Sequence, residues 1–241
     1  MDAAFQILRA HYPQFIMCSA IGYAPYVIAE LVFLSDPARL AAITPVASIL
    51  YGLGIALVYA LMSAVLVVCA SQAYLGDPVD VGAAVRKALP RLHLVILGGI
   101  IRYVGIFFGV FTFFVLSLYL MARWFAVTPV IVLERRGLGA AFSRSAALSS
   151  GRKWHILRTI LLVFVIYLML AIGVQFAASL FRNLIVQAII SALFTILVYP
   201  VVAITEALLY FDTRIKAEGF DIELMTSALE GGDAAREPAA P

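Results

Sequence analysis

The sequence is poor in charged residues: Asp, Glu, Lys and Arg make up 13% of its 241 residues, whereas soluble domains carry about a quarter. Hydrophobic residues make up 64%, and the mean hydropathy is +1.03. A surface of this composition cannot face water, which excludes a soluble enzyme or carrier. We expect an integral membrane protein. We expect no nucleic-acid partner, because no soluble module with a basic face is visible.

Residues that bind metals or form disulfides are also scarce. The two cysteines, Cys18 and Cys69, lie inside apolar runs without CxxC spacing and are expected to be small buried hydrophobes. The three histidines, His11, His93 and His155, have no carboxylate or cysteine at metal-binding spacing. A P-loop, a nucleophile elbow and a dinucleotide fingerprint are absent from the sequence. We therefore predict no cofactor, no metal and no catalytic residue.

Long apolar stretches are abundant. About 20 apolar residues cross a bilayer as a helix, and six stretches qualify: 13–34, 43–70, 92–108, 110–133, 156–180 and 184–211. The third and fourth form one block that must fold back, and Gly105 and Gly109 are the expected bend. The sequence predicts an all-α, polytopic transmembrane helical bundle over residues 1–223. A polar tail, 224–241, is expected to be disordered.

Basic residues are distributed unequally between the span ends. Thirteen Lys and Arg residues fall on the side that includes both termini, against Arg39 and Arg182 on the other. The positive-inside rule then predicts a multi-pass protein of the bacterial inner membrane with both termini in the cytoplasm. The first apolar run is too long for the core of a cleavable signal, so we expect it to be a retained span.

The approaches to the first, third and fifth spans resemble one another. Small residues precede a basic or aromatic patch near Ala4, Ala84 and Ala141. An apolar face opposite a basic face is typical of short interfacial helices. We expect either three repeats of an interfacial helix plus a transmembrane hairpin, or unrelated lead-ins that share an amphipathic pattern.

Three segments also resemble a known family: ARWFAVTPVIVLERRGLGAAFSRSAALSSGRKWHILRTILL (122–162), ALLYFDTRIKAEGFDIE (207–223) and DPVDVGAAVRKAL (77–89). They are similar to the bacterial glycerophosphoryl diester phosphodiesterase membrane domain and to related uncharacterised inner-membrane proteins. The likeness is most specific at Arg123, Pro129, Glu134, Ser145, Gly151, Trp154, Tyr210, Asp212, Arg214, Glu218, Gly219, Phe220 and Asp221. In that family a separate soluble barrel carries the phosphodiesterase chemistry. This sequence holds no such barrel, so the resemblance implies a helical membrane module without that activity.

Arg102, Arg123 and Glu206 are charged residues that lie inside the predicted spans and away from the span ends. A charge near the bilayer centre costs at least ~2.5–3.5 kcal/mol and normally finds a partner. The interpretations are a structural Arg–Glu staple between helices, a polar pocket for a ligand or lipid, or snorkelling of the arginines to the interface.

Two further groups are candidates for interactions at the cytoplasmic side. Charges of alternating sign follow the last span: Asp212, Arg214, Glu218 and Asp221. Together with Tyr210 they are either a partner-docking surface or a cap that fixes the depth of the helix. A belt of cations is expected to contact anionic lipid headgroups: Arg86, Lys87, Arg91, Arg135, Arg136, Arg144, Arg152 and Lys153.

The sequence favours a non-catalytic module that acts as a scaffold, docks a partner or organises lipids. Its partners would be membrane lipids with anionic headgroups, together with another membrane protein or a second copy of the chain. The alternative is a small transporter or lipid-handling protein that uses a pocket at Arg102, Arg123 and Glu206. A transporter predicts a water-reachable cavity at these residues, whereas a scaffold predicts that they are packed and paired.

Overall fold

The computed structural model describes residues 2–36, 44–112 and 114–218, and all regular structure in these ranges is helical. The predicted all-α fold is confirmed. The tail 224–241 and the candidate residue Asp221 lie outside the described residues. The elements are α1 (Asp2–Leu34), α3 (Pro45–Leu75), α4 (Val81–Ala88), the 3-10 turn η1 (Leu89–Arg91), α5 (Leu92–Thr112), α6 (Phe114–Arg123), α7 (Val127–Leu133), α8 (Leu138–Leu148), α9 (Lys153–Ser179) and α10 (Leu184–Glu218).

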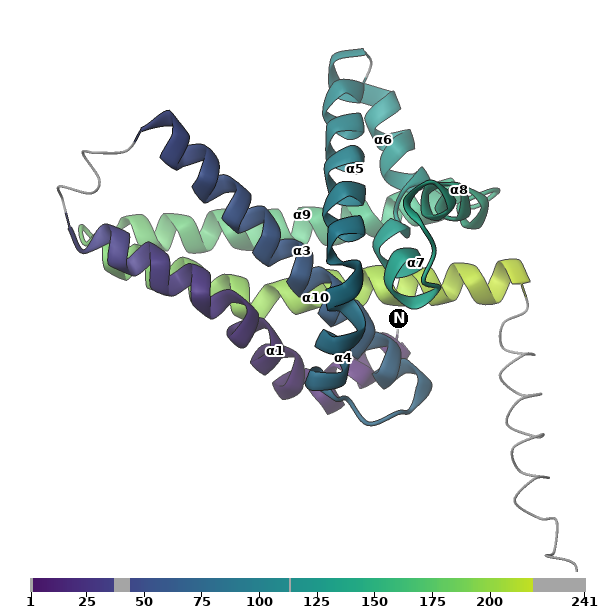
Figure 1. The fold of residues 1–241 in the computed structure, drawn as a ribbon, viewed down its shortest axis with the longest axis horizontal. Coiled ribbons are helices and arrows are strands. Elements are labelled where there is room, and N and C mark those ends of the chain that lie inside the picture. The colour runs from purple at the N-terminus through teal and green to yellow at the C-terminus, as the bar shows by residue number, and fades with distance from the viewer. Residues whose placement is uncertain (1, 37–43, 113, 219–241) are drawn as a thin grey trace, which may run out of the picture.

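Six helical segments in the described ranges are long and apolar enough to cross a membrane, which agrees with the predicted number. They are His11–Leu34, Pro45–Leu75, Val81–Phe111, Phe114–Leu133, Lys153–Ser179 and Leu184–Glu218. Helices α1, α3, α9 and α10 run together, with α10 packed against the other three (Figure 1). The α5–α6 hairpin stands across their direction, and the short helices α7 and α8 lie beside its base (Figure 1).

The bend predicted at Gly105 and Gly109 is wrong. Both glycines lie inside α5, which continues to Thr112 before α6 begins. They face α6 instead: a Cβ on Gly109 would lie 2.9 Å from Ser117 Oγ, and one on Gly105 would lie 2.5 Å from the Trp124 ring. The glycines therefore permit close approach of two antiparallel helices rather than reversal of the chain.

The predicted fourth span, 110–133, is two helices and not one. Helix α6 ends at Arg123, and α7 begins at Val127 after a short irregular segment. Pro129 supplies the physical reason, because its ring would clash with the carbonyl of Phe125 if one helix ran through both positions. The break turns α7 into the interior, where residues 127–132 are all buried.

Short amphipathic helices precede two of the three hairpins. Helix α4 leads into α5, and α8 precedes α9, as the repeat predicts. The N-terminal lead-in differs, because α1 is continuous from Asp2 to Leu34 and has no separate short helix. The Asp80 carboxylate caps α4 by accepting from the backbone N–H of Ala83 at 3.0 Å.

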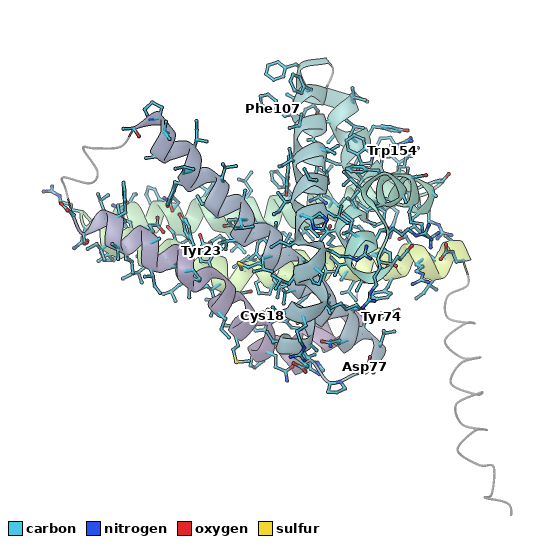
Figure 2. The ribbon with its side chains drawn as sticks, in the orientation of Figure 1. Cys18, Tyr23, Tyr74, Asp77, Phe107 and Trp154 are labelled. Carbon is cyan, nitrogen blue, oxygen red and sulfur yellow. The ribbon has the colours of Figure 1, made fainter. Side chains whose placement is uncertain are left out.

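Burial is concentrated at one end of the molecule. The main hydrophobic cluster joins α7, the second half of α3 and the region of α10 around the fully buried Tyr210. By contrast, large apolar side chains are exposed along α9 and at the tip of the α5–α6 hairpin, where Figure 2 labels Phe107. Outward-facing apolar side chains of this extent are compatible with helices in hydrocarbon.

Candidate functional site

The ends of several helices meet in one region, which we call the basic end: α4, the start of α5, the end of α6, α7 and α8, the start of α9, and the end of α10. Arg91 Nη1 donates to the Arg135 carbonyl at 2.6 Å and so joins the turn η1, directly before α5, to the segment after α7. Arg152 Nη2 donates to the Lys216 carbonyl at 3.0 Å and joins the start of α9 to the end of α10. Two of the predicted headgroup-binding residues, Arg91 and Arg152, therefore also tie helix ends together.

Glu134 is the centre of a charged network at the basic end. Its side chain is 9% exposed and accepts from Arg136 Nε at 2.7 Å and from Arg144 Nε at 3.1 Å. The Tyr210 hydroxyl donates to the same carboxylate at 3.0 Å. Arg144 also pairs with Glu218. The carboxylates of Glu218 and Glu134 raise the pKa of Arg144 above its ordinary value, so this arginine remains charged.

The predicted docking segment on α10 is occupied by contacts within the chain. Arg214 Nε pairs with Glu218 at 3.2 Å, and Lys216 Nζ pairs with Asp212 at 2.6 Å. His155 Nε2 lies 3.6 Å from Asp212 and links the start of α9 to α10. These pairs leave fewer charges for an outside partner and favour the interpretation as a cap on α10.

Arg102 and Glu206 form an ion pair between α5 and α10. Arg102 Nη1 lies 3.2 Å from Glu206 Oε1, and the two side chains are 20% and 17% exposed. Tyr103 lies beside the guanidinium, with its hydroxyl 3.4 Å from Arg102 Nη2. Two of the three predicted span charges are thus paired and largely packed.

Arg123, the third predicted span charge, lies apart from this pair. It ends α6, and its Nη1 donates to the Tyr119 hydroxyl at 2.8 Å. Lys153 Nζ, from the start of α9, lies 3.5 Å from the same hydroxyl. The buried Ser145 on α8 fixes the junction: its hydroxyl donates to the Arg123 carbonyl at 3.0 Å and accepts from the Ala126 N–H at 3.1 Å.

Positive charge exceeds negative charge at the basic end. The cations Arg86, Arg136, Arg144, Arg214 and Lys216 pair with carboxylates. Seven other cations there have no carboxylate partner within the described part of the chain: Lys87, Arg91, Arg123, Arg135, Arg152, Lys153 and Arg158. All eight predicted headgroup-binding residues lie in this region, five of them in this unpaired set.

Sequence reasoning missed Tyr119 and the central position of Glu134. Tyr119 stands four residues before Arg123 on one helix, a spacing at which side chains meet, so this half of the contact had a sequence signal. Lys153 approaches from a different helix, and no spacing along the chain indicates that contact. Glu134 was singled out only by the family resemblance, and its partners come from three separate segments.

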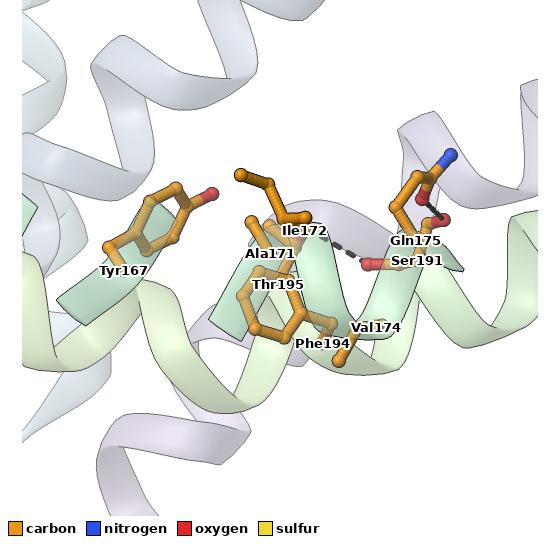
Figure 3. Close-up of a pocket in the computed structure, with 8 residues that line it drawn as sticks. All are labelled: Tyr167, Ala171, Ile172, Val174, Gln175, Ser191, Phe194 and Thr195. Atoms are coloured by element: carbon orange, nitrogen blue, oxygen red, sulfur yellow. Dashed lines mark hydrogen bonds between the residues drawn. The ribbon is translucent and has the colours of Figure 1, made fainter. Parts of the chain in front are cut away.

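A cavity of about 350 Å³ lies between α9 and α10 (Figure 3). Its polar lining includes Gln175 and Ser191, whose side chains hydrogen-bond at 3.1 Å, and Tyr167 lies at one side. Neither Arg102 nor Glu206 lines it. Among the described residues, no group of three or more His, Cys, Asp or Glu side chains is placed to hold a metal ion.

Comparison with protein-family models, curated proteins and solved structures gives no match to this chain. The resemblance at residues 77–89, 122–162 and 207–223 therefore stays a prediction that rests on those residues alone.

Proposed function

We propose that the chain is a non-catalytic, multi-pass protein of the bacterial inner membrane that organises anionic lipids at its basic end. In this proposal both termini and the basic end face the cytoplasm. The six apolar helices anchor the protein in the bilayer. The cations of the basic end then lie at the level of the headgroups, where each Lys or Arg contributes about 1 kcal/mol of attraction to an anionic leaflet.

The observation that carries this proposal is the set of seven cations without carboxylate partners. Arg144 is neutralised within the fold by Glu134 and Glu218, whereas these seven cations leave an excess of positive charge at the basic end. An excess of positive charge on one end of an apolar body matches a surface of negative charge outside the protein.

The packing of Arg102 and Glu206 supports a structural role for this pair over a transport pocket. The two groups are in direct contact at 3.2 Å, and each side chain is at least four-fifths buried. A transport site needs its charged groups to be reachable by water and ligand in at least one state. The proposal therefore treats the pair as a staple between α5 and α10.

The test is lipid selectivity of the purified protein in nanodiscs made from equal amounts of phosphatidylglycerol and phosphatidylcholine. We expect enrichment of phosphatidylglycerol around the wild-type protein. The triple variant Lys87→Gln/Arg135→Asn/Arg158→Gln should lose much of it; asparagine suits position 135, where φ is 55°. Arg182→Gln, at the opposite end, is the matched control and should retain the enrichment. Equal enrichment in all three proteins would contradict a role for the basic end.

A further inference from the structure

Two of the cations without carboxylate partners at the basic end, Arg123 and Lys153, lie close together. They come from different helices, α6 and α9, and converge on one hydroxyl, that of Tyr119, at 2.8 Å and 3.5 Å. Both cations also approach the Tyr119 ring: Arg123 Cζ lies 5.8 Å and Lys153 Nζ 4.6 Å from its centroid. Two positive groups are therefore held around one neutral acceptor.

This arrangement is electrostatically incomplete. Neither cation has a carboxylate partner in the described residues, and like charges that share one acceptor repel each other. Helix α9 adds to the imbalance, because its first turn holds no acidic residue and begins with Lys153. The positive end of a helix favours an anion and disfavours a cation. A bound anion would relieve both repulsions.

The site is preorganised at Arg123. Ser145 holds the backbone on both sides of the α6–α7 break, through the Arg123 carbonyl and the Ala126 N–H. The side chain therefore leaves a fixed point, and the Tyr119 hydroxyl aligns one face of its guanidinium. The remaining N–H groups of Arg123 are donors with the fork geometry that suits phosphate, and Lys153 supplies a second point charge.

The surroundings match the boundary between headgroups and acyl chains. Trp154, next to Lys153, is 77% exposed, and Tyr119 is 38% exposed. Trp154, labelled in Figure 2, lies at the start of α9, which packs against α6. Trp and Tyr are enriched at membrane interfaces. Val115 on α6 and Leu162 on α9 are exposed farther along the same two helices and present apolar surface to an acyl chain.

We propose that Arg123, Lys153 and Tyr119 form a binding site for the phosphate of a lipid headgroup, with the acyl chains lying along α6 and α9. The inference rests on the proposed function and deepens it, because it assigns one defined site within a generally basic surface. The two cations bind the phosphate oxygens, and the Tyr119 hydroxyl fixes Arg123 while its ring packs beside Lys153.

The experiment is native mass spectrometry of the purified full chain, titrated separately with phosphatidylglycerol, with phosphatidylcholine and with inorganic phosphate. Each cation near an anionic group contributes about a fivefold gain in affinity, so Arg123→Gln/Lys153→Gln should weaken the first phosphatidylglycerol by about 25-fold. The control Lys87→Gln/Arg158→Gln removes the same charge from the basic end but leaves the site intact. We expect it to change the first binding step by about twofold or less.

Each outcome decides a different part of the inference. If the two double variants weaken the first lipid equally, the defined site is wrong and only the general basic surface remains. If the wild type shows no preference for phosphatidylglycerol over phosphatidylcholine, the proposed function fails as well. Displacement of the lipid by millimolar inorganic phosphate would assign the site to a soluble phosphate anion and overturn the lipid as its occupant.

A second variant covers the case in which the double variant does not fold. Tyr119→Phe retains the ring and removes only the hydroxyl that aligns Arg123. We expect it to fold and to weaken the first phosphatidylglycerol several-fold, since one hydrogen bond to a charged group is lost. Unchanged affinity in this variant would contradict the assigned role of Tyr119.

Discussion

At the scale of single residues, one buried hydroxyl holds the junction between α6 and α7. Ser145 is fully buried and makes two hydrogen bonds across the break, one to the Arg123 carbonyl and one from the Ala126 N–H. Backbone groups left unpaired away from water cost free energy. The same hydroxyl therefore contributes to the stability of the fold and to the position of Arg123.

We predict that Ser145→Ala lowers the free energy of unfolding by about 1–3 kcal/mol, because it leaves a buried donor and a buried acceptor without a partner. Ser143, exposed on the same helix, provides the matched control: Ser143→Ala should be neutral within about 0.5 kcal/mol. Thermal unfolding of both variants in detergent measures the difference. Similar melting temperatures for the two variants would contradict the role given to Ser145.

The Arg102–Glu206 pair permits a test that separates a staple from a functional pocket. Glu206→Leu alone should destabilise the protein by about 3–5 kcal/mol, because it leaves the Arg102 charge unpaired. Arg102→Leu/Glu206→Leu should recover most of this loss, since apolar residues can replace a buried pair. Melting temperatures and lipid selectivity are measured together. A stable double variant that has lost lipid selectivity would contradict a purely structural role.

Residue types alone predicted part of these contacts. An arginine and a glutamate in separate spans have few other ways to be satisfied, so the sequence predicted an Arg–Glu staple as one interpretation but did not decide whether Arg102 or Arg123 pairs with Glu206. Arg123 could not be assigned in the same way. Its depth depends on the break before α7, and its neighbour Lys153 is supplied by tertiary packing.

At the scale of elements, the α5–α6 hairpin depends on close helix contact at glycine. A Cβ on Gly109 would meet Ser117 Oγ at 2.9 Å and the Ser117 backbone nitrogen at 3.0 Å. Backbone atoms cannot move aside as a flexible side chain can. A larger residue at this position would therefore separate the two helices near the tip of the hairpin.

We expect Gly109→Ala to destabilise the hairpin by about 1–3 kcal/mol through overpacking. Gly99 on the same helix has no atom within 4 Å of an added Cβ, so Gly99→Ala is the control. That change should be neutral or slightly stabilising, because alanine is the better helix former. Limited proteolysis of the hairpin and thermal unfolding report the effect. Equal behaviour of the two variants would argue against close packing at Gly109.

Hydropathy predicted which segments are helical spans, because about 20 apolar residues form a helix in hydrocarbon whatever their order. It did not predict where helices break or turn. Pro129 gave a local signal for the end of α6. No local signal in the sequence indicated that α1 continues as one helix through its N-terminal lead-in. The direction of the α5–α6 hairpin across α9 and α10 (Figure 1) depends on tertiary packing alone.

At the scale of the whole molecule, charge separates the two ends. The cations without carboxylate partners gather at the basic end. At the junction between α9 and α10, Arg182 is the single basic residue. The proposed orientation follows from this difference through the positive-inside rule. Orientation is central to the account, because the anionic lipids that the basic end is proposed to organise must lie in the leaflet that it faces.

Thiol labelling in intact cells tests this orientation most directly. Cys18 and Cys69 are both buried and are first replaced by alanine; single cysteines are then introduced by Lys87→Cys and Arg182→Cys. With a membrane-impermeant maleimide, we predict that Arg182→Cys is labelled in intact cells and that Lys87→Cys is labelled only after lysis. Labelling of Lys87→Cys from outside, with Arg182→Cys protected until lysis, would contradict the account.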